Sequence, residues 1–222
     1  MRLTIFNGSP RGKKSNTKIL LEQFTNGFMA VENNQFEIFY LFDTKAVAEH
    51  VEAFKNSDHV ILAFPLYTDA MPGIVKNFIE ALEPLCGRKK NPSIGFIVQS
   101  GFPEPIHSRY VEKYLIKLAK RLGCEYKGTA IKGGVEGIQV QPESWTKKLF
   151  QSFHQLGLEY AGTGRFSEEI IKMFSRRETM SIAKLMVFKL IQKTGLTNFY
   201  WNSQLKKNNA FENRFARPFE AR

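Results

Sequence analysis

Three short segments of the 222-residue chain combine residue types that bind polar and aromatic ligands. Each segment follows a run of apolar residues that favour β-structure, and each is rich in glycine, proline, hydroxyl or aromatic side chains. The segments cover residues 7–17, 65–73 and 100–104. None of them pairs a histidine with a carboxylate, so they indicate binding of a reactive cofactor rather than acid–base catalysis by side chains.

The first segment suits a phosphate group. It reads Asn7-Gly8-Ser9-Pro10-Arg11-Gly12-Lys13-Lys14-Ser15-Asn16-Thr17 and leads into a helix N-terminus, where unpaired N–H groups favour an anion. The helix dipole contributes only about 0.3–1 kcal/mol, so Ser9, Arg11, Ser15 and Thr17 must supply much of the affinity. The spacing fits neither the GxxxxGK[ST] nor the GxGxxG loop. The alternative is a capped turn with solvated charges.

The second and third segments suit a planar ring. Residues 65–73 offer two prolines, Tyr67, Met71 and free backbone N–H groups, with Asp69 as the only charged side chain. Such a loop fits the polar edge and apolar face of an aromatic cofactor, and the alternative is a rigid strand-to-helix turn. Ser100, Gly101 and Phe102 again place small residues and an aromatic ring at a strand end.

Alternating strands and helices are expected to position these segments. The hydrophobic patterns predict strands over 2–6, 35–42, 59–64, 94–99 and 125–132. They predict helices from Ser15 to Phe28, over 45–56, from Pro72 to Leu82, over 106–122 and over 142–157. This alternation indicates an open parallel sheet with helices on both faces, which binds ligands at the carboxyl ends of its strands.

Residues 165–222 differ in character from the preceding part. They hold 12 Lys/Arg and 5 Asp/Glu, a net charge of +7, against +4 for residues 1–164. Helices are predicted over 167–175 and 178–194, and the second is apolar around most of its circumference. We expect it to pack on the core or on a partner subunit, a membrane-surface helix being the alternative. The aromatic stretch 198–201 is expected to fold back onto the domain.

The composition excludes several classes of protein. Hydrophobic residues make up 43% and charged residues 24% of the chain, which excludes overall disorder. No apolar run approaches the roughly 20 residues that span a bilayer, and the N-terminus turns polar too soon for a secretory signal. The two cysteines, Cys86 and Cys124, lie far apart, so neither a disulfide framework nor a metal site is expected. A reducing cytoplasm is the expected location.

The first two segments resemble those of the flavodoxin-like NAD(P)H-dependent FMN reductases. The matching residues are Gly8-Ser9-Pro10-Arg11, Ser15-Asn16-Thr17, Pro65, Tyr67, Met71-Pro72, Lys76 and Phe78-Ile79. The resemblance covers about residues 1–160. Iron–sulfur relatives carry a compact cysteine cluster near residues 43–60, and this chain has no cysteine there.

The resemblance implies a fold and a cofactor. The fold is a flavodoxin-like open five-stranded parallel sheet of order 2-1-3-4-5, formed by residues 1–164 and followed by a basic helical extension, 165–222. The cofactor is FMN, and Asp69 and Ala70 offer backbone N–H groups to its polar edge. The implied binding residues are Ser9, Arg11, Ser15, Asn16 and Thr17 at the phosphate, and Pro65, Leu66, Tyr67, Thr68, Asp69, Met71, Ser100, Gly101 and Phe102 around the ring.

The implied activity is hydride transfer from NADH or NADPH through flavin N5 to a small acceptor, such as a flavin, a quinone or an aromatic electrophile. No side chain is assigned a catalytic role, and a homodimer is expected. One alternative is a flavodoxin-type electron carrier, although carriers of this fold are acidic and this chain has a net charge of +11. A less favoured alternative is a binder of anionic surfaces or nucleic acid through the basic tail.

Overall fold

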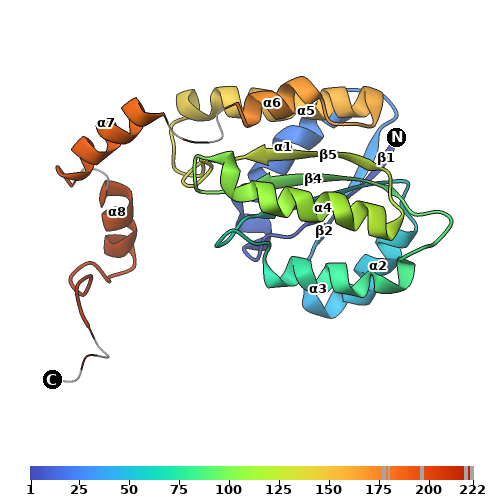
Figure 1. The fold of residues 1–222 in the computed structure, drawn as a ribbon, viewed down its shortest axis with the longest axis horizontal. Coiled ribbons are helices and arrows are strands. Elements are labelled where there is room, and N and C mark those ends of the chain that lie inside the picture. Colours follow the sequence, from blue (N-terminus) through green and yellow to red (C-terminus); the bar gives the residue numbers. More distant parts are fainter. Residues whose placement is uncertain (177–178, 180, 196–197, 218–219, 221–222) are drawn as a thin grey trace. The chain divides into compact units, whose positions relative to one another are not determined.

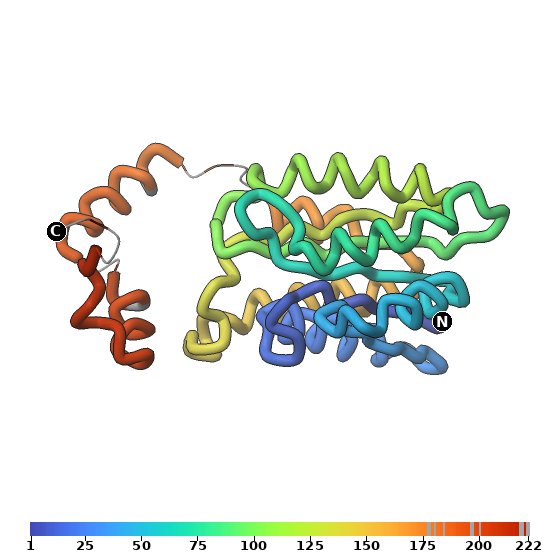
Figure 2. Tube along the Cα trace, turned by 90° about the horizontal axis from the view of Figure 1, so that it is seen from below, coloured from blue at the N-terminus to red at the C-terminus, as the bar shows by residue number. Residues whose placement is uncertain are grey.

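The computed structural model describes residues 1–176, 179, 181–195, 198–217 and 220. The chain forms two compact units, an N-terminal unit of Met1–Thr179 and a C-terminal unit of Met180–Arg222. Figure 2 traces the chain from its first strand in blue to the C-terminal unit in orange and red.

The N-terminal unit is built on a five-stranded parallel sheet of order β2-β1-β3-β4-β5. This order confirms the predicted flavodoxin-like fold. Apolar side chains on both faces of β3 and β4 are buried, as continuous hydrophobic runs require. The strands are β1 (Arg2–Asn7), β2 (Gln35–Tyr40), β3 (His59–Pro65), β4 (Ser93–Gln99) and β5 (Tyr126–Lys132).

Helices cover both faces of the sheet (Figure 1). On one face lie α1 (Asn16–Met29), α5 (Glu143–Thr163) and α6 (Glu168–Phe174), which share a core with Ile5 and Ile61. On the other lie α2 (Val47–Lys55), α3 (Gly73–Ala81) and α4 (Arg109–Leu122), packed around Phe6 and Leu62. The 3₁₀ turns are η1 (Gly12–Lys14), η2 (Thr44–Ala46), η3 (Glu83–Leu85) and η4 (Pro105–Ser108), and η4 replaces the start of the helix predicted over 106–122.

The boundary between the two units follows Thr179, which is further along the chain than the expected boundary at 164/165. Phe166, Ile170 and Phe174 are buried in the core beneath α1 and α5, so α6 is part of the N-terminal unit. The α5 helix also continues to Thr163, beyond the predicted end at residue 157.

The C-terminal unit contains α7 (Ile182–Gln192) and α8 (Phe199–Lys207). The helix predicted over 178–194 is therefore shorter, and its residues 178 and 180 lie outside the described part. Across the described residues, every helix is too short or too polar to traverse a bilayer.

Two glycines let α1 and α5 cross at close range. A Cβ atom on Gly27 would lie 1.8 Å from the carbonyl oxygen of His154, and one on Gly157 would lie 1.9 Å from that of Phe24. Both contacts are with backbone atoms, which cannot rotate away. The position of α1 therefore depends on the absence of side chains at both residues.

Replacing Gly157 with alanine is expected to lower the free energy of unfolding by about 1–3 kcal/mol or more, because α1 and α5 must move apart. Gly162 is the matched control on the same helix, since a Cβ there meets nothing within 4 Å. Gly162→Ala should be neutral or stabilise by up to about 1 kcal/mol through helix propensity. Urea unfolding measures both, and equal effects of the two substitutions would contradict the close crossing.

Candidate functional site

A pocket lies at the carboxyl ends of the central strands, where the chain winds from β1 to β2 on one side and on to β3 on the other. Such a switch point is where open α/β sheets bind ligands. All three segments singled out in the sequence reach it. Its lining residues are Ser9, Arg11, Asn16, Pro65, Leu66, Tyr67, Gln99, Ser100, Gly101 and Glu136.

The turn after β1 is fixed against β3 and α3. The Gly8 N–H donates to the carbonyl oxygen of Ala63 at 2.7 Å. A Cβ on Gly8 would lie 2.3 Å from Val75 Cγ2, and one on Gly12 would lie 2.7 Å from the Phe42 ring. Gly12 also has a φ of +53°, which favours glycine. Both glycines are therefore required by the path of this turn.

The first turn of α1 presents two backbone donors that have no partner within the described residues. Ser15 Oγ accepts from the Lys18 N–H at 3.1 Å and donates to the Gly12 carbonyl at 2.7 Å, so this hydroxyl is engaged as the helix N-cap. Among the described residues, nothing accepts from the amides of Asn16 and Thr17. These two N–H groups can bind an anion.

Asn7 adds a buried donor at the end of β1. Its Oδ1 accepts from the Ser9 N–H at 3.0 Å. Its Nδ2 is buried and has no partner in the described part of the chain. A buried amide donor of this kind requires an explanation, and a ligand group or an ordered water would provide one.

The turn after β3 is strained. Tyr67 and Ala70 exchange backbone hydrogen bonds of 2.8 and 3.0 Å, and the residues between them, Thr68 and Asp69, have φ of +50° and +60°. Left-handed backbone costs a non-glycine residue roughly 1–2 kcal/mol. The Ala70 amide is engaged in the turn, whereas those of Thr68 and Asp69 have no partner among the described residues.

The turn after β4 is held by the segment after β5. Gly134 N–H donates to the Phe102 carbonyl at 2.8 Å, and Val135 N–H donates to that of Ser100 at 3.0 Å. Asn16 Nδ2 in turn donates to the Val135 carbonyl at 2.9 Å. The segment after β5 therefore links the first and third ligand-binding turns.

His107 connects the second and third turns. Its Nδ1 lies 3.1 Å from Asp69 Oδ1, and its Nε2 lies 3.8 Å from Glu104 Oε2. Its ring lies over Phe102, with 4.7 Å between the ring centroids. Asp69 is thus held in place by a histidine of η4.

The structure separates the predicted residues into two groups. Those that line the pocket are Ser9, Arg11, Asn16, Pro65, Leu66, Tyr67, Ser100 and Gly101. The others surround it: Ser15 and Thr17 are buried in the first turn of α1, Thr68 and Asp69 form the strained turn, Phe102 contacts His107, and Met71 packs against the core.

Gln99 and Glu136 also line the pocket. Gln99 Nε2 donates to Thr17 Oγ1 at 3.3 Å, which connects the end of β4 with α1. A polar residue closing an apolar strand was the available signal for Gln99. The glycines before Glu136 gave a weaker one.

One family of known proteins matches part of the chain. Residues 1–95 match the family model of the NADPH-dependent FMN reductases. The match includes the first two ligand-binding turns. It confirms the resemblance noted in the sequence, and with it the enzyme class and the cofactors: an NAD(P)H-dependent oxidoreductase that uses FMN. No curated protein matches the chain.

Solved structures share the fold at low sequence identity. An FMN-dependent NADH-azoreductase from Bacillus anthracis has a TM-score of 0.56 at 15% identity, covering 72% of this chain and all of that one (100%). An NAD(P)H:quinone oxidoreductase from Methanothermobacter marburgensis has a TM-score of 0.56 at 16% identity, covering 71% and 98%. An NADH:FMN oxidoreductase has a TM-score of 0.53 at 19% identity, covering 75% and 90%.

Replacing Ser15 with alanine is expected to lower the free energy of unfolding by about 1 kcal/mol, because α1 loses its N-cap hydrogen bond. Ser108 is a matched control: it precedes α4, is equally buried, and its hydroxyl has no partner in the described chain. Ser108→Ala should cost nothing measurable or stabilise slightly. Denaturant unfolding compares the two, and an equal cost would contradict the capping role of Ser15.

Proposed function

We propose that this protein is an FMN-dependent oxidoreductase that takes hydride from NADH or NADPH and reduces a small acceptor such as a flavin, a quinone or an aromatic electrophile. The observation that carries the proposal is the pocket at the switch point. There an anion-binding helix N-terminus meets two turns suited to a planar ring, and the helix N-terminus and the turn after β3 lie within residues 1–95, which match the reductase family model.

The donors at the first turn of α1 fit a phosphate. The amides of Asn16 and Thr17 and the hydroxyl hydrogen of Ser9 have no acceptor in the described chain. Arg11 forms no ion pair with any described carboxylate and lines the pocket. A phosphate dianion would accept from all of these groups, and charge-assisted bonds of this kind are among the stronger ones in proteins. Ser15 contributes by fixing the helix start through its N-cap hydroxyl rather than by a bond to the phosphate.

The second and third turns fit the ring system. Pro65, Leu66 and Tyr67 from the second turn line the pocket together with Ser100 and Gly101 from the third. The free amides of Thr68 and Asp69 would donate to the polar edge of the ring, and donors in that position stabilise negative charge. The strained turn keeps both amides available because its own hydrogen bonds use only those of Tyr67 and Ala70.

FMN, when bound, supplies the acceptance and donation of hydride, and the protein supplies binding and orientation. The His107–Asp69 contact holds the second turn beside the third, so that the ring-binding surfaces keep their spacing. The homodimer and the cytoplasmic location remain predictions.

Rapid mixing tests the proposed activity. Protein loaded with FMN should show flavin absorbance that is bleached by NADH, NADPH or both under anaerobic conditions, and that returns when an acceptor is added. Comparing the two nucleotides identifies the donor. FMN-loaded protein that is bleached by neither would instead support the electron-carrier alternative.

Substitutions test the placement of the phosphate. Arg11→Ala and Ser9→Ala should each raise the dissociation constant of FMN by about tenfold or more, since each removes a bond to a charged group. Met71→Ala should raise it less, because Met71 packs against the core rather than lining the pocket. Fluorescence titration measures all three constants. A larger effect of Met71→Ala would contradict the phosphate assignment.

A further inference from the structure

The α7 helix exposes a stripe of apolar side chains. Ile182, Met186 and Leu190 are 72%, 65% and 70% exposed. Because they are spaced four residues apart, they lie along one face of the helix, and exposed Val187 widens this stripe. The apolar side chains on the other sides of the helix are less exposed, with Leu185 at 40%, Phe188 at 46% and Ile191 at 41%. Exposed apolar stripes on this scale mark surfaces that are covered by a partner or by lipid.

Cations accompany this stripe. Lys189 lies beside it on the helix, and Lys193 follows directly after the helix end. Residues 180–222 hold eight Lys/Arg and two Asp/Glu, a net charge of +6. Lysine stems can lie along apolar surface while their ammonium groups reach polar or charged surroundings. A partner that is both apolar and anionic therefore complements both features of this surface.

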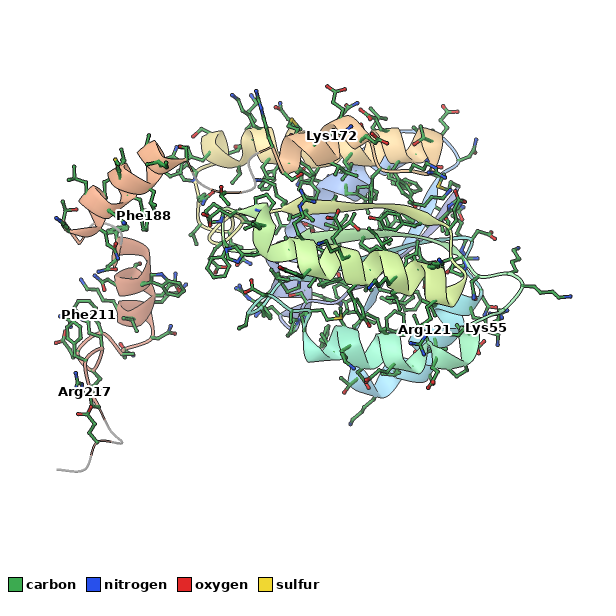
Figure 3. All side chains as sticks on the ribbon, in the orientation of Figure 1. Lys55, Arg121, Lys172, Phe188, Phe211 and Arg217 are labelled. Carbon is green, nitrogen blue, oxygen red and sulfur yellow. The ribbon has the colours of Figure 1, made fainter. Side chains whose placement is uncertain are left out.

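A second basic and aromatic cluster follows α8. Lys206 Nζ lies 4.9 Å from the centre of the Phe211 ring, and Arg214 Cζ lies 3.9 Å from the same ring and 4.8 Å from that of Phe215. Phe215 is 81% exposed. Figure 3 labels Phe211 here and Phe188 on α7. The cluster places two cations against aromatic rings, of which Phe215 is exposed and Phe211 is half-buried.

We propose that the C-terminal unit docks the protein on an anionic membrane surface. The stripe of Ile182, Met186, Val187 and Leu190 enters the boundary between headgroups and acyl chains, and the lysines and arginines contact lipid phosphates. The 11-residue α7 is far too short to span a bilayer, so the helix lies in the interface.

Charge and apolar surface together favour an anionic membrane over two other partners, a second copy of the chain and nucleic acid. A second copy would bring a net charge of +6 against another +6, which opposes association through this surface. Nucleic acid would neutralise the cations but would leave the apolar stripe in water. An anionic bilayer satisfies both features at once.

Vesicle flotation with the full-length protein tests the proposal. The protein should float with vesicles of phosphatidylcholine containing about 30% phosphatidylglycerol and should not float with pure phosphatidylcholine. Raising the salt concentration should weaken the binding, because the attraction of the cations is screened. Failure to bind the anionic vesicles, or equal binding to both kinds, would overturn the proposal.

Paired variants locate the surface. M186E/L190E and K189E/K193E should each lower the partition coefficient onto anionic vesicles by about tenfold or more. I116E/M173E and K117E/K120E make the same changes of charge at exposed positions of α4 and α6, and they should bind nearly as well as the unmodified chain. Circular dichroism and FMN binding establish that each variant is folded. Equal losses in the controls would overturn the assignment to α7.

Two further outcomes identify a different partner, and each overturns the proposal. The first is a chain that binds no vesicles and sediments as a dimer that M186E/L190E dissociates, which assigns the stripe to a second copy. The second is salt-sensitive binding to duplex DNA in place of vesicles, which assigns the cations to nucleic acid.

Discussion

The parallel pairing of β1 with β3 is the constraint on which the site depends. The pairing places Asn7 opposite Ala63, and the hydrogen bond from the Gly8 N–H to the Ala63 carbonyl extends it one residue beyond β1. The chain can then turn only where a side chain is absent, because Val75 occupies the space that a Cβ would need. As a result, the first turn of α1 lies beside the end of β3, and two of its backbone amides have no acceptor in the part of the chain that the structure describes. The anion-binding and ring-binding parts of the pocket are neighbours for this reason.

The other turns are held by contacts that cross between loops. Val135 accepts from Asn16 and donates to Ser100, so one residue joins the turns after β1 and β4. His107 and Asp69 join the turns after β3 and β4. Each ligand-binding turn is therefore supported by another turn, in addition to its own strand. A site built in this way is preorganised for a rigid planar ligand, because the unbound turns have little freedom to lose.

Local sequence patterns were sufficient to predict the sheet, its helices and the turns that carry the pocket. Apolar runs such as 59–64 specify buried strands, and Gly8, Gly12 and Ser15 specify a turn that enters a helix. Contacts between distant segments were not predictable in the same way. The proximity of Glu136 and Gln99 to Ser9 depends on how β4 and β5 are placed, and the engagement of the Ser15 hydroxyl depends on the path of Gly12. The first unit extends beyond the expected boundary at residue 164 because Phe166, Ile170 and Phe174 are buried in its core. Local sequence patterns do not show that this core needs further apolar side chains.

The crossing at Gly27 and Gly157 also bears on cofactor affinity. Gly27 lies 11 residues along α1 from Asn16, a distance of about 16 Å at 1.5 Å per residue. The helix is rigid between these points, so its contact with α5 sets the direction of the whole helix. A tilt imposed there would swing the amides of Asn16 and Thr17 away from the pocket. Substitutions in α5, remote from any ligand, would then weaken flavin binding. A genetic screen for colourless variants would identify such substitutions together with those of the pocket residues.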